Sequence, residues 1–366
     1  MIKKKPKVLV GMSGGVDSSV AAALLVQAGY EVIGGFIKNW SDTKDLWTGE
    51  CAWRGERRDA LRVAARLDIP LLTFDFEKEY RKRVLDRMFA EYEQGLTPNP
   101  DVLCNEEIKF GLFFEEAMKA GCEFVATGHY ARVKRDRTGS AHLLKGADPD
   151  KDQSYFLHRV SQKVLRQTLF PIGHLKKARV RKLAEQLKLS TASKPDSQGI
   201  CFVGKLDFHD FLRKRIKSKP GKIVDEHGAI LGQHDGLDAY TIGQRTGLKV
   251  SHDQRAWYVV AKDRNKNQLI IVPDREHPLL YQKQATVRGV NWIVPPKKMP
   301  CKIDAAIRYR QKPEKARLIL CHSSEGGNLR LEFRHPVWAL APGQSAVFYR
   351  GTECLGGGFI SEQSLH

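Results

Sequence analysis

The stretch VLVGMSGGVDSSVAAALL, residues 8–25, constrains the fold more than any other part of the chain. It predicts a strand at Val8–Val10, a turn of small residues and then an Ala/Leu-rich helix. Glycines allow the backbone to turn tightly and to bring its N–H groups close to a ligand. The N-terminus of the helix adds further N–H donors and a partial positive charge. The stretch therefore predicts an anion site, usually one for phosphate.

Strand and helix patterns alternate along the first 130 residues. Strands are predicted at Val8–Val10, Val32–Ile37, Leu71–Phe76 and Phe124–Thr127, with helices near 18–28, 54–67, 77–93 and 106–120. This alternation is typical of a parallel sheet with helices on both faces. Ligands of such sheets bind beyond the carboxyl ends of the strands, which is where the glycine-rich turn lies.

The rest of the chain has a different pattern of apolar and polar residues. Residues 131–145 predict a hairpin, and residues 161–170 and 175–188 predict amphipathic helices. From Lys222 on, short apolar runs are broken by Gly, Pro, Asn and Asp, a pattern typical of small β-barrels. Pro220–Gly221 is a plausible boundary between the two parts.

Length and charge limit the classes of protein to consider. At 366 residues the chain is long for a single core, and we expect two or three domains. Its 61 basic and 42 acidic residues give a net charge of +19, which favours a polyanionic partner such as nucleic acid over a membrane. No apolar run reaches the ~18 residues that span a bilayer, and the basic N-terminal stretch lacks the apolar segment of a signal peptide. We therefore expect a cytoplasmic protein.

The glycine-rich turn is not a Walker A loop, because no Lys lies between Gly11 and Val26. It carries Asp17, and a carboxylate beside phosphates repels them unless a metal lies between, so Asp17 implies Mg²⁺. The alternative is an ordinary strand-to-helix turn with Ser18 and Ser19 as caps. The pattern S-G-G-V-D-S resembles the PP-loop of the N-type ATP pyrophosphatases. This resemblance implies that ATP is cleaved between its α- and β-phosphates.

The seven cysteines are widely spaced and form no C-x-x-C pair, so neither a zinc knuckle nor a disulfide framework is expected. Cys104 is predicted just before a helix, with Asn105 as the N-cap. The helix dipole there favours a thiolate, but the two glutamates that follow oppose it. A capped helix with an incidental buried Cys is the alternative. Cys201 follows a glycine on a loop without apolar periodicity, which makes an accessible thiol plausible.

Taken together, the motifs GMSGGVDSS, TPNPDVLCN, EIKF, ATGHYAR, KDQSYFL, SQGICF, YTIGQR, AIRYRQ, PGQSAVFY and CLGGG recur in the order seen in tRNA-specific 2-thiouridylases. The resemblance to this family implies an α/β fold with three domains. These are a PP-loop (adenine nucleotide alpha hydrolase-like) parallel-sheet domain at 1–208, a small central β-containing domain at 209–278 and a C-terminal β-barrel at 279–366. It also implies an enzyme, a sulfurtransferase that replaces the C2 oxygen of the wobble uridine of certain tRNAs by sulfur.

The resemblance further implies a mechanism. AMP from ATP is attached to the C2 oxygen of uridine, which turns a poor leaving group into a good one. A persulfide on Cys201, loaded by a sulfur-carrier protein, then attacks C2. Cys104 is implied as the second catalytic thiol, which frees sulfide or resolves the persulfide as a Cys104–Cys201 disulfide bond. An external thiol then reduces the disulfide.

Site residues are implied position by position. Asp101 would act as acid or base, and Asn99, Pro100 and Asp101 would hold the flipped-out target base. The residues implied to bind ATP, with Asp17 on Mg²⁺, are Gly11, Met12, Ser13, Gly14, Gly15, Val16, Asp17, Ser18, Ile37 and Gly128. Those implied to contact the anticodon stem-loop of tRNA are His129, Lys151, Asp152, Gln153, Arg308, Tyr309 and Gln344. Without the resemblance, a polar surface residue is the favoured explanation for each member of this last set.

Two other functions stay open on the sequence. Another PP-loop enzyme, an amide or amidine ligase, would activate a carboxyl or carbonyl group for attack by nitrogen, and Cys104 and Cys201 would be idle. A non-enzymatic RNA-binding protein would use the loop only to hold nucleotide and would release no pyrophosphate.

Overall fold

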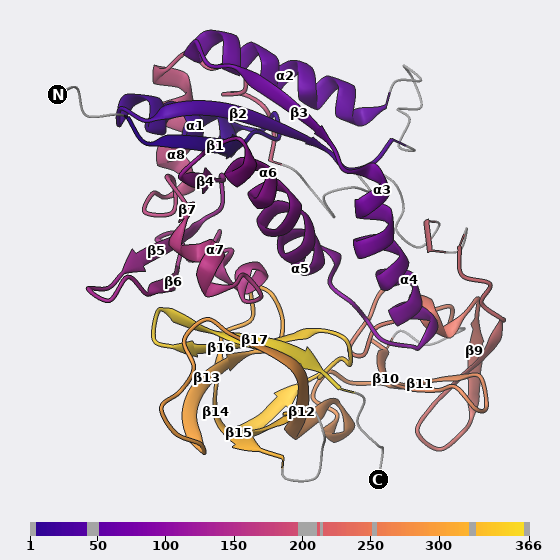
Figure 1. Ribbon diagram of the computed structural model, residues 1–366. Coiled ribbons are helices and arrows are strands. Elements are labelled where there is room, and N and C mark those ends of the chain that lie inside the picture. Colours follow the sequence, from indigo (N-terminus) through magenta and orange to yellow (C-terminus); the bar gives the residue numbers. More distant parts are fainter. Residues whose placement is uncertain are drawn as a thin grey trace.

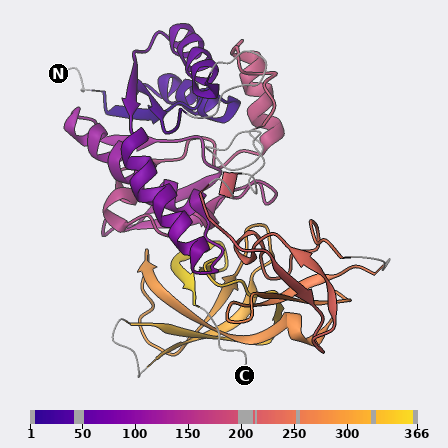
Figure 2. The same cartoon turned by 90° about the vertical axis from the view of Figure 1, so that its right-hand side faces the viewer.

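The structure is a computed structural model that describes residues 5–41, 51–196, 211–212, 215–250, 255–321 and 327–361. An N-terminal α/β part is stacked on a β-rich C-terminal part, and the last strands of the chain lie where the two meet (Figures 1 and 2). This arrangement confirms the predicted fold class. The described residues contain no helix long and apolar enough to cross a membrane.

The α/β part is built on a parallel sheet with the strand order β3-β2-β1-β4-β7. Its strands are β1 (Lys7–Gly11), β2 (Glu31–Lys38), β3 (Leu71–Asp75), β4 (Phe124–Ala126) and β7 (Thr168–Leu169). The four strands predicted from the alternating pattern are thus confirmed to within two residues at each end.

Both faces of this sheet are covered, as parallel sheets require. Val8 and Val10 pack into a core shared with α1 (Val16–Gln27), α2 (Ala52–Leu67) and α8 (Lys177–Gln186). Leu9 points the other way because successive strand residues face opposite sides, and it packs against Phe113. The glycine-rich turn follows β1 at the carboxyl edge of the sheet.

Two long helical segments lie between β3 and β4 in the chain. The helix predicted at 77–93 consists of α3 (Glu77–Tyr80), the π-helix η1 (Arg81–Leu85) and α4 (Asp86–Glu93). The helix predicted at 106–120 begins earlier. It consists of α5 (Pro100–Leu103), the π-helix η2 (Cys104–Leu112) and α6 (Phe113–Lys119).

Asn99, and not Asn105, is the N-cap of this second segment. Its Oδ1 accepts hydrogen bonds from the N–H groups of Asp101 (3.1 Å) and Val102 (3.4 Å), and Pro100 occupies the first helical position. The prediction that Cys104 lies just before the helix is therefore wrong, because a full helical turn precedes it.

The helix predicted at 161–170 is also shorter than expected. α7 (Gln162–Arg166) takes its first half, and Thr168 and Leu169 form β7 alongside β4. The N–H groups of Val125 and Thr127 donate to the carbonyls of Gln167 (2.8 Å) and Leu169 (3.2 Å). The sheet edge thus supplies hydrogen-bond partners that favour a strand over the local helical pattern.

The β-rich part contains a small sheet and a closed barrel. The small sheet has the order β10-β11-β8-β9, from β8 (Gly221–Val224), β9 (Ile230–His234), β10 (Tyr258–Asp263) and β11 (Gln268–Val272). The antiparallel barrel has the order β12-β15-β14-β13-β16-β17 and closes between β12 and β17. Its strands are β12 (Tyr281–Trp292), β13 (Cys301–Ala306), β14 (Glu314–Leu320), β15 (Leu329–Trp338), β16 (Ser345–Arg350) and β17 (Glu353–Ile360). The domain boundaries at 208 and 278 stay predictions, and the first lies outside the described residues.

The predicted hairpin at 131–145 joins the α/β part to the barrel. Its strands β5 (Ala131–Arg135) and β6 (Ala141–Lys145) pair with each other, and β6 pairs with β17 through Leu143–Cys354 and Leu144–Glu353. A hairpin of the α/β part therefore extends the sheet of the barrel (Figure 1).

His142 lies at this joint between two carboxylates. Its Nδ1 is 2.5 Å from Oε1 of Glu353 on β17, and its Nε2 is 3.2 Å from Oδ2 of Asp136. The hydrogen bond with Glu353, assisted by the one with Asp136, outweighs burial and raises the pKa of His142 above 6.5. A protonated imidazole donates to both carboxylates and so stabilises the joint.

We expect His142→Gln to destabilise the protein in a pH-dependent way. Because the folded-state pKa is raised, the contribution of His142 is full below the unfolded-state pKa and is lost as pH rises through the folded-state pKa. Urea unfolding should show a clear loss of unfolding free energy at about pH 6 and a much smaller one at about pH 9. His335→Gln, at an exposed position of β15, is the control. A loss that stays constant over this range would contradict the expectation.

Candidate nucleotide and thiol site

The glycine-rich turn is tied together by its own serines. Ser18 Oγ donates to the carbonyl of Gly15 (3.1 Å) and accepts from the N–H of Ser13 (3.2 Å). Gly14 has a φ of +73°, and a Cβ there would lie 2.2 Å from the Glu56 carbonyl oxygen. Gly15 is the N-cap of α1 and has no side chain to cap with, so the first-turn N–H groups lack an intrahelical partner. The turn can therefore offer these N–H groups to an anion.

Gly128 lies against this helix terminus. It follows β4, and a Cβ there would be 2.7 Å from the Ser18 nitrogen and 2.8 Å from the Asp17 carbonyl carbon. The close approach of two backbone segments thus explains a glycine at this position. A contact of Gly128 with nucleotide stays a prediction.

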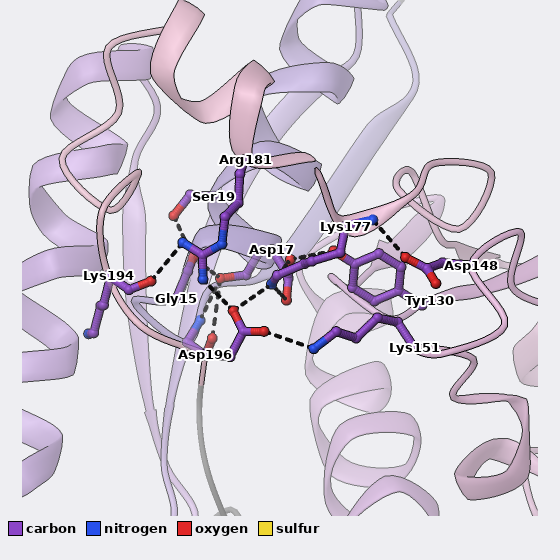
Figure 3. A network of polar contacts seen from close by, with 12 residues as sticks. Gly15, Asp17, Ser19, Tyr130, Asp148, Lys151, Lys177, Arg181, Lys194 and Asp196 are labelled. Atoms are coloured by element: carbon purple, nitrogen blue, oxygen red, sulfur yellow. Dashed lines mark hydrogen bonds and ion pairs between the residues drawn. The ribbon is translucent and has the colours of Figure 1, made fainter. Parts of the chain in front are cut away.

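Asp17 is bound on both oxygens by groups from distant parts of the chain (Figure 3). Lys177 Nζ lies 2.7 and 2.8 Å from the two carboxylate oxygens, and the Tyr130 hydroxyl donates to Oδ1 at 2.7 Å. Burial and then the charge of Asp17 raise the pKa of Tyr130, so its hydroxyl stays a donor. The protein itself therefore supplies a cation to the carboxylate of the turn.

Asp196 extends this network (Figure 3). It accepts from Lys151 (2.9 Å), Lys177 (3.0 Å) and Arg181 (2.5 Å). Burial alone would raise the pKa of Asp196, but the hydrogen bonds from Lys151 and Lys177 outweigh it and hold the pKa below 3.8. Lys194 donates to the carbonyl of Gly14 at 3.0 Å. Four cationic side chains thus gather beside a turn with open N–H donors, an arrangement suited to a polyphosphate.

The KDQ motif at 151–153 makes contacts inside the protein. Asp152 Oδ1 accepts from the N–H groups of Gly146 (2.9 Å) and Ser154 (3.0 Å). Gln153 pairs with Tyr130 in both directions: its Oε1 accepts from the Tyr130 N–H and its own N–H donates to the Tyr130 carbonyl, both at 2.9 Å. Gln153 therefore fixes the tyrosine that binds Asp17, a role that the sequence did not reveal. Their contact with RNA stays a prediction.

Cys104 is the first residue of η2 and is 1% exposed. Its apolar cluster includes Met88 and Phe359, and Ile37 and Trp40 from the end of β2 and the loop after it pack against the same cluster. The structure thus brings Cys104 and Ile37, a residue predicted to bind ATP, to one cluster. π-Helical turns often occur at functional sites. The helix dipole favours a Cys104 thiolate less than predicted. It acts mainly on the first turn of a helix, and α5 precedes Cys104.

The two glutamates expected to oppose a thiolate at Cys104 are both paired. Arg159 binds Glu106 through two nitrogens, each 2.7 Å from a carboxylate oxygen. Arg83 lies 3.5 Å from Glu107. Their negative charges are therefore largely compensated, which removes the electrostatic objection to a thiolate.

Three predicted tRNA contacts lie at joints within the protein. Arg308 donates to the carbonyls of Ile242 (2.6 Å) and Ala339 (2.8 Å), and burial lowers the pKa of its guanidinium. The Tyr309 ring packs 4.3 Å from that of Phe156. Gln344 Nε2 donates to the carbonyl of Thr97 at 2.7 Å, close to the N-cap Asn99. Their contacts with RNA stay predictions.

His129, a further predicted tRNA contact, is 8% exposed. Its Nδ1 lies 2.7 Å from the Thr127 hydroxyl, and burial lowers its pKa well below 6.5, so the ring is neutral. Such a ring could reach RNA only if its surroundings opened, and this contact also stays a prediction.

Cys201 lies outside the described residues, so the Cys104–Cys201 disulfide stays a prediction. No disulfide joins two of the cysteines within the described ranges. No group of three or more His, Cys, Asp or Glu side chains suited to a metal occurs among the described residues either.

A cavity of about 540 Å³ opens beyond β3, lined by Trp40, Asp75, Glu77, Lys78, Glu79 and Arg81. Two of its carboxylates, Asp75 and Glu77, each lie 2.9 Å from Lys38. The lining has three carboxylates and two cations, whereas the group around Asp17 has four cations and the three carboxylates of Asp17, Asp59 and Asp196. The cavity therefore suits a polyphosphate less well.

The contacts of Gln153 lead to a test of its role. We expect Gln153→Leu to lower the free energy of unfolding by ~1–3 kcal/mol, because the buried N–H of Tyr130 loses its acceptor. Gln153→Glu keeps an acceptor oxygen and should lose clearly less stability than Gln153→Leu. Urea unfolding of both variants measures the difference. Equal stability of the two variants would show that this hydrogen bond does not hold Tyr130.

The chain matches three family models in succession. They are described as the tRNA methyl transferase HUP domain at residues 6–205, the tRNA methyl transferase PRC-barrel domain at 209–273 and the aminomethyltransferase beta-barrel domain at 282–360. The first model alone covers more than half of the chain.

Two solved structures show a weaker likeness. A 4-thiouridine synthetase–RNA complex with bound ATP is 16% identical with a TM-score of 0.35, over 58% of this chain and 50% of that chain. NMN synthetase from Francisella tularensis is 19% identical with a TM-score of 0.34, over 56% of this chain and 71% of that chain. These TM-scores are too low to support an argument about fold or function.

Curated relatives match nearly the whole chain. The tRNA-specific 2-thiouridylase MnmA of Enterococcus faecalis is 46% identical over 362 residues, which cover 97% of this chain and 95% of the relative. The protein of the same name from Geobacillus thermodenitrificans is 46% identical over 357 residues, with the same two shares. The predicted resemblance is confirmed, and the chain belongs to the family of tRNA-specific 2-thiouridylases.

Proposed function

We propose that the protein is a tRNA-uridine 2-sulfurtransferase that uses ATP to thiolate C2 of the wobble uridine. The match with 2-thiouridylases over 97% of the chain carries this proposal. The structure supports it in two ways. The glycine-rich turn offers N–H donors beside four cationic side chains, and Ile37, which is predicted to bind ATP, packs against the cluster that contains Cys104.

The first step activates the base. The C2 oxygen of uridine attacks the α-phosphorus of ATP, the bond from that phosphorus to the β,γ-bridge breaks, and pyrophosphate leaves. The N–H groups of the turn and the cations Lys177 and Lys194 stabilise the negative charge that moves onto the pyrophosphate. Asn99 caps α5 and accepts from the backbone N–H of Asp101. In this proposal the segment holds the base, and the Asp101 carboxylate accepts the N3 proton that adenylation releases.

The second step transfers sulfur. The terminal sulfur of a Cys201 persulfide attacks C2, and the C2–O bond breaks so that AMP leaves with the oxygen. The Cys104 thiolate then attacks the inner sulfur of Cys201. The S–S bond breaks, thiouridine keeps the terminal sulfur, and a Cys104–Cys201 disulfide forms that an external dithiol reduces. Alternatively, Cys104 attacks the inner sulfur of the persulfide before transfer. The disulfide then forms first, and the hydrogen sulfide that leaves attacks C2. The same disulfide and the same thiouridine result.

Magnesium fits this site through one protein carboxylate. Mg²⁺ in nucleotide sites is usually held by one or two carboxylates together with phosphate oxygens and water. Asp17 can provide that carboxylate once Lys177, which occupies both of its oxygens, moves towards the phosphates. When bound, the ion would supply charge neutralisation at the leaving pyrophosphate.

Two partners follow from this proposal. The net charge of +19 suits binding of a tRNA anticodon stem-loop through its phosphates. A sulfur-carrier protein is needed as the persulfide donor, because the reaction consumes one sulfur atom per turnover. Such chemistry belongs in the cytoplasm, where reductants keep thiols reduced.

Cysteine variants test the proposal. With ATP, Mg²⁺, a persulfide donor and unmodified tRNA, the parent protein should release AMP and pyrophosphate only in the presence of tRNA. Cys104→Ser and Cys201→Ser should each reduce the 2-thiouridine found by nucleoside analysis at least ~100-fold, because a hydroxyl neither carries nor releases sulfur. Both should still form pyrophosphate. Cys321→Ser, at a half-buried position after β14, is the matched control and should thiolate normally.

The same assay separates the alternatives. Unchanged thiolation in both cysteine variants would refute the persulfide mechanism. Pyrophosphate without any thiouridine, indifferent to both cysteines, would favour an amide or amidine ligase. Binding of tRNA without pyrophosphate would leave an RNA-binding protein. The first two family models carry the name of a methyl transferase. A parallel reaction supplied with a methyl donor such as S-adenosylmethionine tests that activity, and methylated tRNA without AMP release would favour it.

A further inference from the structure

The helix that carries Cys104 is held by the barrel at a point just beyond this cysteine. We propose that Arg159 is a positioning residue, which fixes η2 against the barrel strands β12 and β17 and so sets where the Cys104 thiol lies. This inference rests on the proposed function and adds a role for the barrel in the chemical step.

Arg159 binds η2 in a geometry that fixes direction as well as charge. Its Nε and Nη2 each lie 2.7 Å from an oxygen of Glu106, two residues after Cys104. The two side chains are only 17% and 22% exposed. A bidentate and partly buried pair of this kind is stronger and more directional than an exposed ion pair.

The same guanidinium also contacts two barrel strands. Its Nη1 donates to the carbonyl of Gly289 on β12 at 2.5 Å. Its central carbon lies 5.0 Å from the ring centroid of Phe359 on β17. Asn291 on β12 donates to the carbonyl of His158 at 2.8 Å, which fixes the backbone immediately before Arg159. Arg159 therefore bridges the barrel and the thiol-bearing helix with both its backbone and its side chain secured.

A second contact holds the chain before this helix. The N–H of Thr97 donates to the carbonyl of Pro342 at 2.8 Å, and Gln344 donates to the carbonyl of Thr97 at 2.7 Å. Gly343 lies between them with a φ of +88°, and a Cβ there would be 2.8 Å from the Thr97 nitrogen. The barrel thus contacts the segment on both sides of Asn99, Asp101 and Cys104.

The position of the Cys104 thiol matters because the reacting sulfur atoms must approach each other in line. A displacement of about 1 Å can lower a rate by about 100-fold without any change in the reacting groups. η2 is a π-helix, a rare form that usually needs its surroundings to maintain it. We therefore expect loss of the Arg159 bridge to slow sulfur transfer while tRNA still binds.

The test measures single-turnover thiolation at saturating tRNA, together with the tRNA dissociation constant and the melting temperature. Arg159→Gln and Glu106→Gln should each lower the thiolation rate ~10–100-fold, and the double variant should be no slower than either single one. Arg159→Lys keeps the charge but binds fewer partners, so its thiolation rate should lie between those of the parent protein and Arg159→Gln. The tRNA dissociation constant should change less than ~twofold in all of them, because none of these side chains is assigned to the RNA.

Two comparisons make the outcome decisive. An effect of charge alone would move the two single variants in opposite directions, because Arg159→Gln leaves a carboxylate near the thiol and Glu106→Gln leaves a cation. Arg83→Gln is the matched control. Its pair with Glu107, at 3.5 Å, involves the same helix but stays within the α/β part, and its rate should change less than ~twofold.

The inference is overturned if Arg159→Gln thiolates at the parent rate, if the single variants move in opposite directions, or if the loss follows a fall in melting temperature that Arg83→Gln shares. In each of these cases the parent protein still thiolates and the proposed function stands. A parent protein that neither thiolates tRNA nor releases pyrophosphate would instead overturn the proposed function.

Discussion

The arrangement of the site depends on the pairing of Asp17 with Lys177. A carboxylate close to bound phosphate repels it unless a cation lies between them, and α8 supplies a cation to Asp17 at 2.7 Å. Lys177 also binds Asp196, which gathers Lys151 and Arg181 to the same place. In the proposed function, these cationic side chains would exchange their carboxylate partners for the phosphates of the bound nucleotide.

The α/β part and the barrel are connected next to this site. The hairpin β5–β6 belongs to the α/β part, yet it extends the sheet of the barrel and leads directly to the motif that holds Tyr130 against Asp17. The barrel also contacts the Cys104 segment through Thr97 and Arg159. These contacts connect the barrel with the segments that carry Tyr130 and Cys104.

The sequence predicted the features that depend on local pattern and missed those that depend on distant partners. The apolar alternation of β1 to β4 and the glycine-rich turn are local, and both are confirmed. The start of α5 is also encoded locally, in Asn99–Pro100. The prediction placed the N-cap at Asn105 instead, because it took Cys104 as the residue just before the helix. β7 forms only because β4 offers it partners. The Glu106–Arg159 pair joins residues 53 positions apart, and no spacing rule reveals such a contact.

The most direct test of the central claim follows the oxygen that sulfur replaces. A tRNA carrying ¹⁸O at C2 of the target uridine is incubated with the protein, ATP, Mg²⁺ and a persulfide donor, and the AMP is examined by mass spectrometry. If the C2 oxygen is adenylated and leaves with the nucleotide, each thiolation event should place one ¹⁸O atom in the phosphate of AMP. Thiolated tRNA accompanied by unlabelled AMP would contradict the account, because the oxygen would then have left by another route.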